Sequence, residues 1–237
     1  DDPETRRQIT ATQFASSGLA GVWAESNTRG AIFDAMKRKE TFGTSGPRMK
    51  VRFFGGMGYA PSMLDDADLL ARAYDGGVPM GGQLEKVSGD AAPGFLVWTM
   101  RDPMSAPLQR AQVVKVWTDS GETHEAVHDV ACSGGAIPDA DTHRCPDNGA
   151  GVNTSDCSTE AGSGANELKA YWTDPDFNAD REAAYYVRVL ENPTCRWSTW
   201  DAVRNGTPPN PELAETVQER AWSSPIWYAG LDRVVSE

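Results

Sequence analysis

The sequence predicts a mainly β protein of the α+β class, in which a helix–strand unit precedes an antiparallel, immunoglobulin-like β-sandwich. Three observations lead to this prediction. After residue 82, apolar residues recur at every second position in six short segments that turn residues separate. Before residue 82, the segment 28–42 shows helical spacing instead. Hydrophobic residues make up 39% of the 237 residues, enough for a sizeable core.

The first unit, residues 1–82, is predicted to hold one main helix and one strand. Asn27 or Thr28 can cap the helix, because a side-chain oxygen satisfies a free backbone N–H group at its start. Gly43 and the run Ser45-Gly46-Pro47 end it near residue 42, and a strand follows at 49–54. A short helix at 65–74 and a Gly-rich connector at 76–82 complete this unit, so we place a domain boundary near residue 82.

The second unit, residues 83–237, is predicted to be the sandwich. Its expected strands are 95–100, 110–118, 125–131, 168–172, 184–190 and 221–227. Two short helices are expected near the end. The first, at 198–205, is capped by Ser198 and closed by Gly206, and the second, at 211–218, starts at Pro211 after Asn210.

Four cysteines, none in a Cys-x-x-Cys pair, indicate disulfides rather than a zinc ribbon. Cys145 and Cys157 flank a Gly/Ser/Asn-rich stretch inside a Cys-bounded loop, 132–165. We expect a bond between these two, which would leave Cys132 to pair with Cys195, although three pairings are open to four cysteines. Disulfides favour an oxidising compartment, so the predicted location is periplasmic or secreted.

The overall charge excludes one class of partner. A formal net charge of -12 repels phosphate backbones, so nucleic acid is not an expected ligand. No stretch approaches the ~20 apolar residues of a membrane span. The acidic start, Asp1-Asp2-Pro3-Glu4, has no signal-peptide character, and we expect a processed or truncated N-terminus.

The stretch from His124 to His128 spells the zinc-protease motif HExxH. That chemistry requires a helix, because helical pitch places both imidazoles on one side of a metal ion. The surrounding pattern instead predicts a strand, on which positions four apart are about 13 Å apart. We therefore expect a coincidental match and no metal site in this chain.

Two other patterns suggest binding sites. The segment from Asp174 to Glu182 resembles the start of a calcium loop, but the position that requires Gly is Ala179 and the one that requires Glu is Tyr185, so a turn is expected. The numerous C-terminal aromatic residues would form a glycan-stacking platform if exposed. We expect them instead to pack in the sandwich and under its helices. They are Trp172, Tyr185, Tyr186, Trp197, Trp200, Trp222, Trp227 and Tyr228.

Several longer stretches resemble known families. The stretch GLAGVWAESNTRGAIFDAMKRKETFGTSGPRMKVRFFGG (18–56) is similar to the terminal helix–strand unit of the polymerase-and-histidinol-phosphatase (PHP) superfamily. The strings GVPMGG, QVVKVWTDSGETHEAVHDVA, YWTDPDF, YYVRVLENPTCRW and QERAWSSPIWY resemble a bacterial family of unknown function, number 3604. The resemblance covers roughly residues 14–228. It departs from the pattern at Gly30, at Phe42 and in the cysteine loop.

The resemblance implies an α/β metal-dependent hydrolase barrel that is followed by a β-sandwich. PHP enzymes cleave phosphate esters with metal-activated water, and their metal ligands come from strands earlier in the chain. The three histidines here all follow residue 82, so the divalent metal is expected in a barrel part outside this chain. The catalytic residues are therefore unknown, and the turn from Thr44 to Arg48 is the candidate active-site rim. The candidate site residues are Arg29, Thr44, Ser45 and Arg48. Of these, Arg29 or Arg48 would pair with an anionic substrate.

The predicted function is accordingly the C-terminal fragment of a secreted metal-dependent hydrolase, similar to phosphoesterases and without a complete active site of its own. The alternatives are a non-catalytic sandwich that binds glycan or a partner protein, and a purely structural buttress. The expected partner is the missing barrel segment or another copy of the chain. Without a barrel, the apolar face of the helix at 28–42 is expected to pack on the sandwich, on residues 59–74 or on another copy of the chain.

Overall fold

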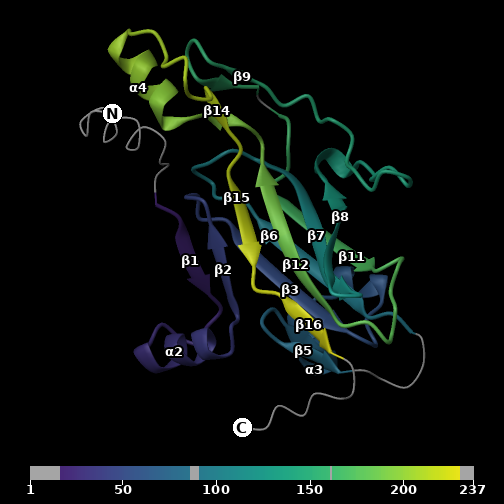
Figure 1. The fold of residues 1–237 in the computed structure, drawn as a ribbon. Helices are drawn as coiled ribbons and strands as arrows, with labels where there is room; N and C mark the ends of the chain where they lie inside the picture. Colours follow the sequence, from purple (N-terminus) through teal and green to yellow (C-terminus); the bar gives the residue numbers. More distant parts are fainter. Residues whose placement is uncertain (1–16, 86–90, 161, 230–237) are drawn as a thin grey trace.

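The alternating segments form two packed β-sheets in the computed structural model, which describes residues 17–85, 91–160 and 162–229 (Figure 1). Among these residues the larger sheet has eight strands. Its spatial order is β1 (Leu19–Val22), β2 (Thr41–Thr44), β15 (Arg220–Ser223), β12 (Ala183–Glu191), β16 (Ile226–Ala229) and β5 (Gln83–Glu85). Strand β7 (Leu108–Asp119) also pairs with β12, and β8 (Glu122–Cys132) pairs with β7. All pairs are antiparallel except β16 with β5.

The smaller sheet has the order β11 (Glu167–Thr173), β6 (Gly94–Met100), β3 (Lys50–Gly56) and β4 (Val78–Pro79). Two short ladders lie outside the sandwich. They join β9 (Val152–Asn153) to β10 (Ser158–Thr159), and β13 (Thr194–Cys195) to β14 (Thr216–Val217). The described helices are α2 (Arg29–Lys37), α3 (Leu69–Gly76) and α4 (Trp197–Asn205), with 3-10 turns η1 (Pro61–Asp65) and η2 (Ser133–Gly135).

The main core lies between the two sheets. Strands β3, β6 and β11 contribute residues such as Phe53 and Phe95, and β7 and β12 contribute Val113 and Val187 from the opposite side. A second, smaller core covers the outer face of the four-stranded sheet, where η1 and α3 pack on Phe54 and its neighbours. Residues on both sides of position 82, which we expected to form two domains, therefore share the sheets and the main core.

Most predicted strands are confirmed, and the first error lies at the end of a helix. Helix α2 starts after the Thr28 cap but ends at Lys37 rather than near residue 42. Lys39 has a φ of 59°, a left-handed turn that stops the helix. Residues from Thr41 onward then pair with both β1 and β15, so the ladder takes the segment that we expected in the helix.

Three further corrections concern local structure. The helix expected at 65–74 is present as α3, but it starts later, at Leu69, after the 3-10 turn η1. The helix expected at 211–218 is absent, because Asn210 accepts a hydrogen bond from the Glu212 N–H group and forms a turn before β14. The strand expected at 221–227 is divided into β15 and β16 around Ser224, whose N–H group donates to the Thr41 carbonyl oxygen.

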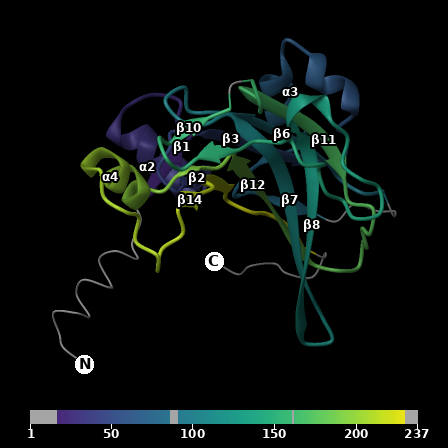
Figure 2. The same ribbon diagram turned by 90° about the horizontal axis from the view of Figure 1, so that it is seen from above.

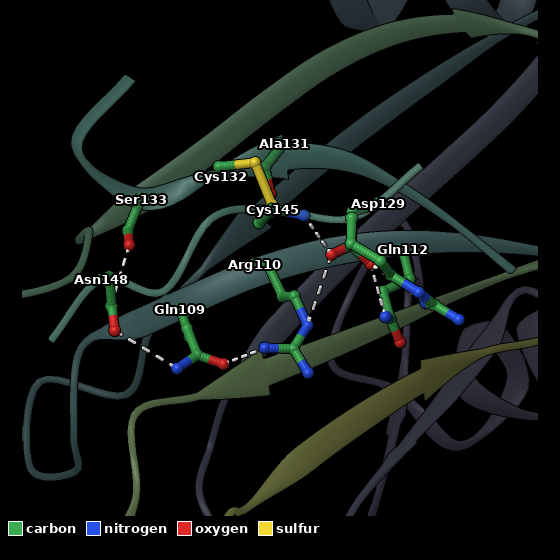
Figure 3. The surroundings of a disulfide bond; sticks show 10 residues. Gln109, Arg110, Gln112, Asp129, Ala131, Cys132, Ser133, Cys145 and Asn148 are labelled. Atoms are coloured by element: carbon green, nitrogen blue, oxygen red, sulfur yellow. Dashed lines mark hydrogen bonds and ion pairs between the residues drawn. A yellow bond between two sulfur atoms is a disulfide. The ribbon is translucent and has the colours of Figure 1, made fainter. Parts of the chain in front are cut away.

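The four cysteines form two disulfides, as expected, but our favoured pairing is wrong: Cys132 bonds Cys145, and Cys157 bonds Cys195. The Asp129 carboxylate accepts a 2.7 Å hydrogen bond from the Cys145 N–H group and so holds Cys145 beside the end of β8 (Figure 3). Cys157 takes a left-handed turn after β9 and meets β13. The hydrogen bonds that fold the loop, rather than the number of residues between the cysteines, therefore bring each cysteine to its disulfide partner.

No described helix is long and apolar enough to cross a membrane.

Candidate functional site

The predicted rim turn, Thr44 to Arg48, joins β2 to β3 at one end of the sandwich. Thr44 is buried, and its hydroxyl accepts a hydrogen bond from the Gly46 N–H group. Ser45 is tied to β15, since its hydroxyl donates to the Glu219 carboxylate and accepts from the Arg220 N–H group at 2.8 Å. The turn is thus anchored by a strand that lies about 175 positions later in the chain.

Arg48 is anchored through its backbone, while its side chain is exposed. Its N–H group donates to an Asp102 carboxylate oxygen at 2.7 Å, and the other oxygen accepts from the Met104 N–H group. These two hydrogen bonds, the Arg48 one foremost, lower the pKa of Asp102. Asp102 therefore remains ionised and fixes the position from which the Arg48 guanidinium extends into solvent.

A fully buried carboxyl, Glu191, lies at the same end of the sandwich. One oxygen accepts a 2.6 Å hydrogen bond from the Ser105 hydroxyl, and the other has no hydrogen-bond partner in the described structure. Desolvation, to which the carboxylates of Glu219 and Asp102 add, raises the pKa of Glu191 to about 7, although the Ser105 hydrogen bond opposes the rise. Near neutral pH, this carboxyl group is therefore only partly ionised.

The Glu191 carboxyl predicts a specific pH dependence of stability. The folded pKa, about 7, exceeds the ordinary value of 4.5, so the unfolded chain ionises first as the pH rises. Stability falls between pH 4.5 and about 7, by up to about 3 kcal/mol, and then levels off. The change Glu191→Gln should leave stability unchanged near pH 4 and raise it by about 1–3 kcal/mol at pH 8.

Urea unfolding of both proteins at pH 4, 6 and 8 measures this difference. The exposed hairpin-turn residue Glu122 supplies the control, since Glu122→Gln should shift stability by less than about 0.5 kcal/mol at every pH. A difference between native protein and Glu191→Gln that does not change with pH would refute the assignment.

Arg29 does not join the other rim candidates. It starts α2, whose C-terminal end leads into β2, whereas the rim turn follows the opposite end of β2 (Figure 1). Thr44, Ser45 and Arg48 are brought together, and Arg29 lies apart from them. Sequence reasoning found the turn but missed Asp102, Glu191 and Glu219, which only long-range strand pairing brings to it.

The HExxH segment lies on strand β8, as predicted. His124 stacks on Trp117, with ring centroids 5.4 Å apart. His128 is buried 4.5 Å from the His143 ring, and desolvation, followed by the His143 charge, lowers its pKa. No group of three or more His, Cys, Asp or Glu side chains in the described part of the chain is arranged to hold a metal ion.

The calcium-like segment contributes to the core instead of forming an open loop. The Asp174 carboxylate is buried, with the Lys115 ammonium group at 2.5 Å and the Tyr185 hydroxyl at 2.7 Å. Lys115 also donates to the Asp176 carbonyl oxygen. Lys115 occupies an inward position of β7, between Val113 and Trp117. A lysine at an apolar position of an alternating strand indicates a buried acidic partner, and the sequence alone shows this pattern.

Comparison with known proteins yields one match. The family model described as "Protein of unknown function (DUF3604)" covers residues 1–230. No curated protein and no solved structure matches the chain.

Proposed function

The chain belongs to the DUF3604 family, and on this basis we propose that it is the C-terminal part of a secreted or periplasmic metal-dependent hydrolase, similar to phosphoesterases. In this proposal the metal ligands come from a barrel segment outside these residues. The described residues do not fit a catalytic metal, because they contain no cluster of three suitable side chains. This chain would instead support the barrel and supply part of the rim of its active site.

The observation that carries the proposal is the uncovered β1–α2–β2 unit. Phe33 and Met36 on α2 are 63% and 58% exposed, and Leu19 on β1 is 44% exposed. Strand β1 pairs only with β2 in the described structure, so its other edge is open. Figure 1 shows α2 projecting beside the sandwich rather than packing on it. An open strand edge thus lies beside an exposed apolar helix face. An added α/β layer would cover both.

The rim turn would act on the substrate through its exposed cation. Arg48 carries a guanidinium group that can bind two oxygens of a phosphate or carboxylate at once. The hydrogen bond from its N–H group to Asp102 fixes the backbone from which the side chain extends. The Ser45 hydroxyl is engaged by Glu219 and Arg220, so we assign it to positioning the turn rather than to nucleophilic attack.

A comparison of two proteins tests the proposal: the 237-residue chain, and the same chain extended by the reading frame that precedes Asp1 in its gene. Both are assayed with p-nitrophenyl phosphate and bis-p-nitrophenyl phosphate in Mn²⁺, Zn²⁺ or Mg²⁺. We expect hydrolysis by the extended protein alone. Hydrolysis by the 237-residue chain, or a preceding frame without a set of His and Asp or Glu ligands, would refute the proposal.

The docking role of α2 gives a separate prediction. The double change Phe33→Ser with Met36→Ser should weaken association with a separately expressed barrel segment by at least about tenfold, because it removes apolar contact area. Isothermal titration calorimetry measures the affinity. Met104→Ser is the matched control, since Met104 is 92% exposed and lies on the β6–β7 turn. Equal losses in both variants would contradict docking through α2.

A further inference from the structure

The two sheets differ in how their outer faces are covered. Tyr59, Met63, Leu69 and Ala73, from η1, α3 and their flanks, cover the outer face of the four-stranded sheet. Figure 2 shows α3 over that sheet, whereas α2 and α4 lie away from it, at opposite ends of the molecule in Figure 1. In the part of the chain that the structure describes, no helix lies across the outer face of the eight-stranded sheet.

Three aromatic side chains lie on the part of this face that β12, β15 and β16 form: Trp222 of β15, Tyr186 of β12 and Trp227 of β16. Side chains alternate between the two faces of a strand, and the sequence neighbours of these three residues are all buried on the inner face. Those neighbours are Tyr185, Val187, Ala221, Ser223, Ile226 and Tyr228. Trp227 is 49% exposed, and Trp222 and Tyr186 are half-buried.

The strand register sets the spacing of the three rings. Trp222 pairs with Arg188 of β12, and Trp227 pairs with Ala184 of the same strand. These partners are four residues apart, which corresponds to about 13 Å along the strand. Tyr186 lies midway between them on β12. The aromatic side chains therefore form a row with the length of a short oligosaccharide.

Beside Trp222, the outer face of the sheet carries small residues instead of large side chains. Gly43 pairs with Trp222 on one side and with Ala20 on the other. A Cβ atom added at Gly43 would meet only the Leu19 carbonyl oxygen, at 3.9 Å. Two small residues, Gly43 and Ala20, thus lie next to the indole, and the space above Gly43 is open.

On the other side of Trp222 a chain of polar groups crosses the sheet. The Arg188 Nε group donates to the Gln112 side-chain oxygen at 2.6 Å, and the Gln112 amide donates to Asp129 at 2.6 Å. Arg188, Gln112 and Asp129 are cross-strand neighbours in the same row as Trp222. An arginine has five N–H donors in a fixed plane, so a group bound on Trp222 would meet hydrogen-bond donors at its edge.

We propose that this outer face, defined by Trp222, Tyr186, Trp227, Gly43 and Arg188, binds a neutral polysaccharide. A pyranose ring presents C–H groups on its faces and hydroxyls around its rim. Stacking on an indole removes the C–H groups from water, while Arg188 binds the rim hydroxyls. The net charge of -12 opposes polyanionic chains, which favours an uncharged glycan. This proposal does not depend on the proposed hydrolase activity.

Affinity electrophoresis and pull-down with cellulose, chitin, xylan and β-glucan test the proposal on the full 237-residue chain. We expect the native protein to bind at least one of these glycans. Trp222→Ala and Trp227→Ala should each weaken that binding by about tenfold or more, equivalent to ~1.4 kcal/mol. Gly43→Leu should have a similar effect, because its side chain would fill the open space above Gly43 and leave every aromatic ring in place.

Trp200→Ala is the matched control, because Trp200 is 37% exposed but lies on α4, away from the sheet face. Its binding should equal that of the native protein. Circular dichroism and thermal melting verify that each variant is folded. If Trp222→Ala unfolds, Trp227→Ala still tests the proposal, because Trp227 is the most exposed of the three rings. The proposal is overturned if native protein binds none of the neutral glycans, if both tryptophan variants bind normally, or if the face mediates self-association instead.

Discussion

Replacing Asp174 by Asn is expected to lower the free energy of unfolding by about 3–5 kcal/mol. The Lys115 side chain is 3% exposed and lies 2.5 Å from a fully buried Asp174 carboxylate oxygen. Removing the negative charge leaves a buried ammonium group that keeps only the Asp176 carbonyl oxygen and the Trp117 ring, 5.0 Å away, as partners in the described structure. The cost is that of an unpaired charge in a medium of low dielectric constant, which exceeds the cost of losing a surface ion pair. Chemical denaturation at neutral pH measures the change.

Two further variants make this prediction specific. Combining Asp174→Asn with Lys115→Met removes both charges and should recover most of the lost stability, because no unpaired charge then remains buried. The exposed pair of Arg181 and Asp119 provides the control, and Asp119→Asn should cost less than about 1 kcal/mol. A denaturation midpoint for Asp174→Asn equal to that of the native protein would show that the buried pair contributes no stability.

The bond between Cys157 and Cys195 is expected to contribute more stability than the bond between Cys132 and Cys145. The first closes a separation of 38 residues and the second one of 13 residues. Loop-closure entropy predicts about 4 kcal/mol for the longer loop and about 3 kcal/mol for the shorter one. The paired change Cys157→Ser with Cys195→Ser should therefore lower the unfolding free energy by about 4 kcal/mol, and the other pair by about 3 kcal/mol.

Non-reducing peptide mapping by mass spectrometry identifies the connectivity, and urea unfolding of each double-serine variant gives the free energies. The matched single change Cys145→Ser should free Cys132 for thiol labelling while Cys157 and Cys195 remain protected. A peptide that joins Cys145 to Cys157 would contradict the structure. Two native disulfides also favour an oxidising compartment outside the cytosol.

The strands of the sandwich were predictable because their signal is local. In β12, buried side chains at Tyr185, Val187 and Val189 alternate with half-buried ones, and the printed sequence shows this period directly. The same reasoning correctly placed HExxH on a strand. Helix α4 was found because Gly206 closes it in a left-handed conformation, a local requirement that the residue type reveals.

The remaining features depend on partners that are distant in the sequence. Strand β2 was missed because Thr41–Thr44 becomes a strand only between β1 and β15. The disulfide pairing depends on the Asp129 carboxylate, which holds Cys145 against β8. In the candidate site, the Ser45 turn was found from its Gly and Pro residues, but Glu191 and Glu219 reach it only through the folded strand order. Residue spacing does not carry that information.

The central position of β15 also constrains when the protein can fold. Strand β2 cannot complete its pairing until residues 220–223 exist, and the hydroxyl contact between Thr41 and Ser224 joins positions 183 residues apart. During synthesis, the N-terminal part of the larger sheet therefore remains incompletely paired until residues 220–223 have left the ribosome. Because this pairing joins residues that are distant in the sequence, the larger sheet is expected to fold slowly.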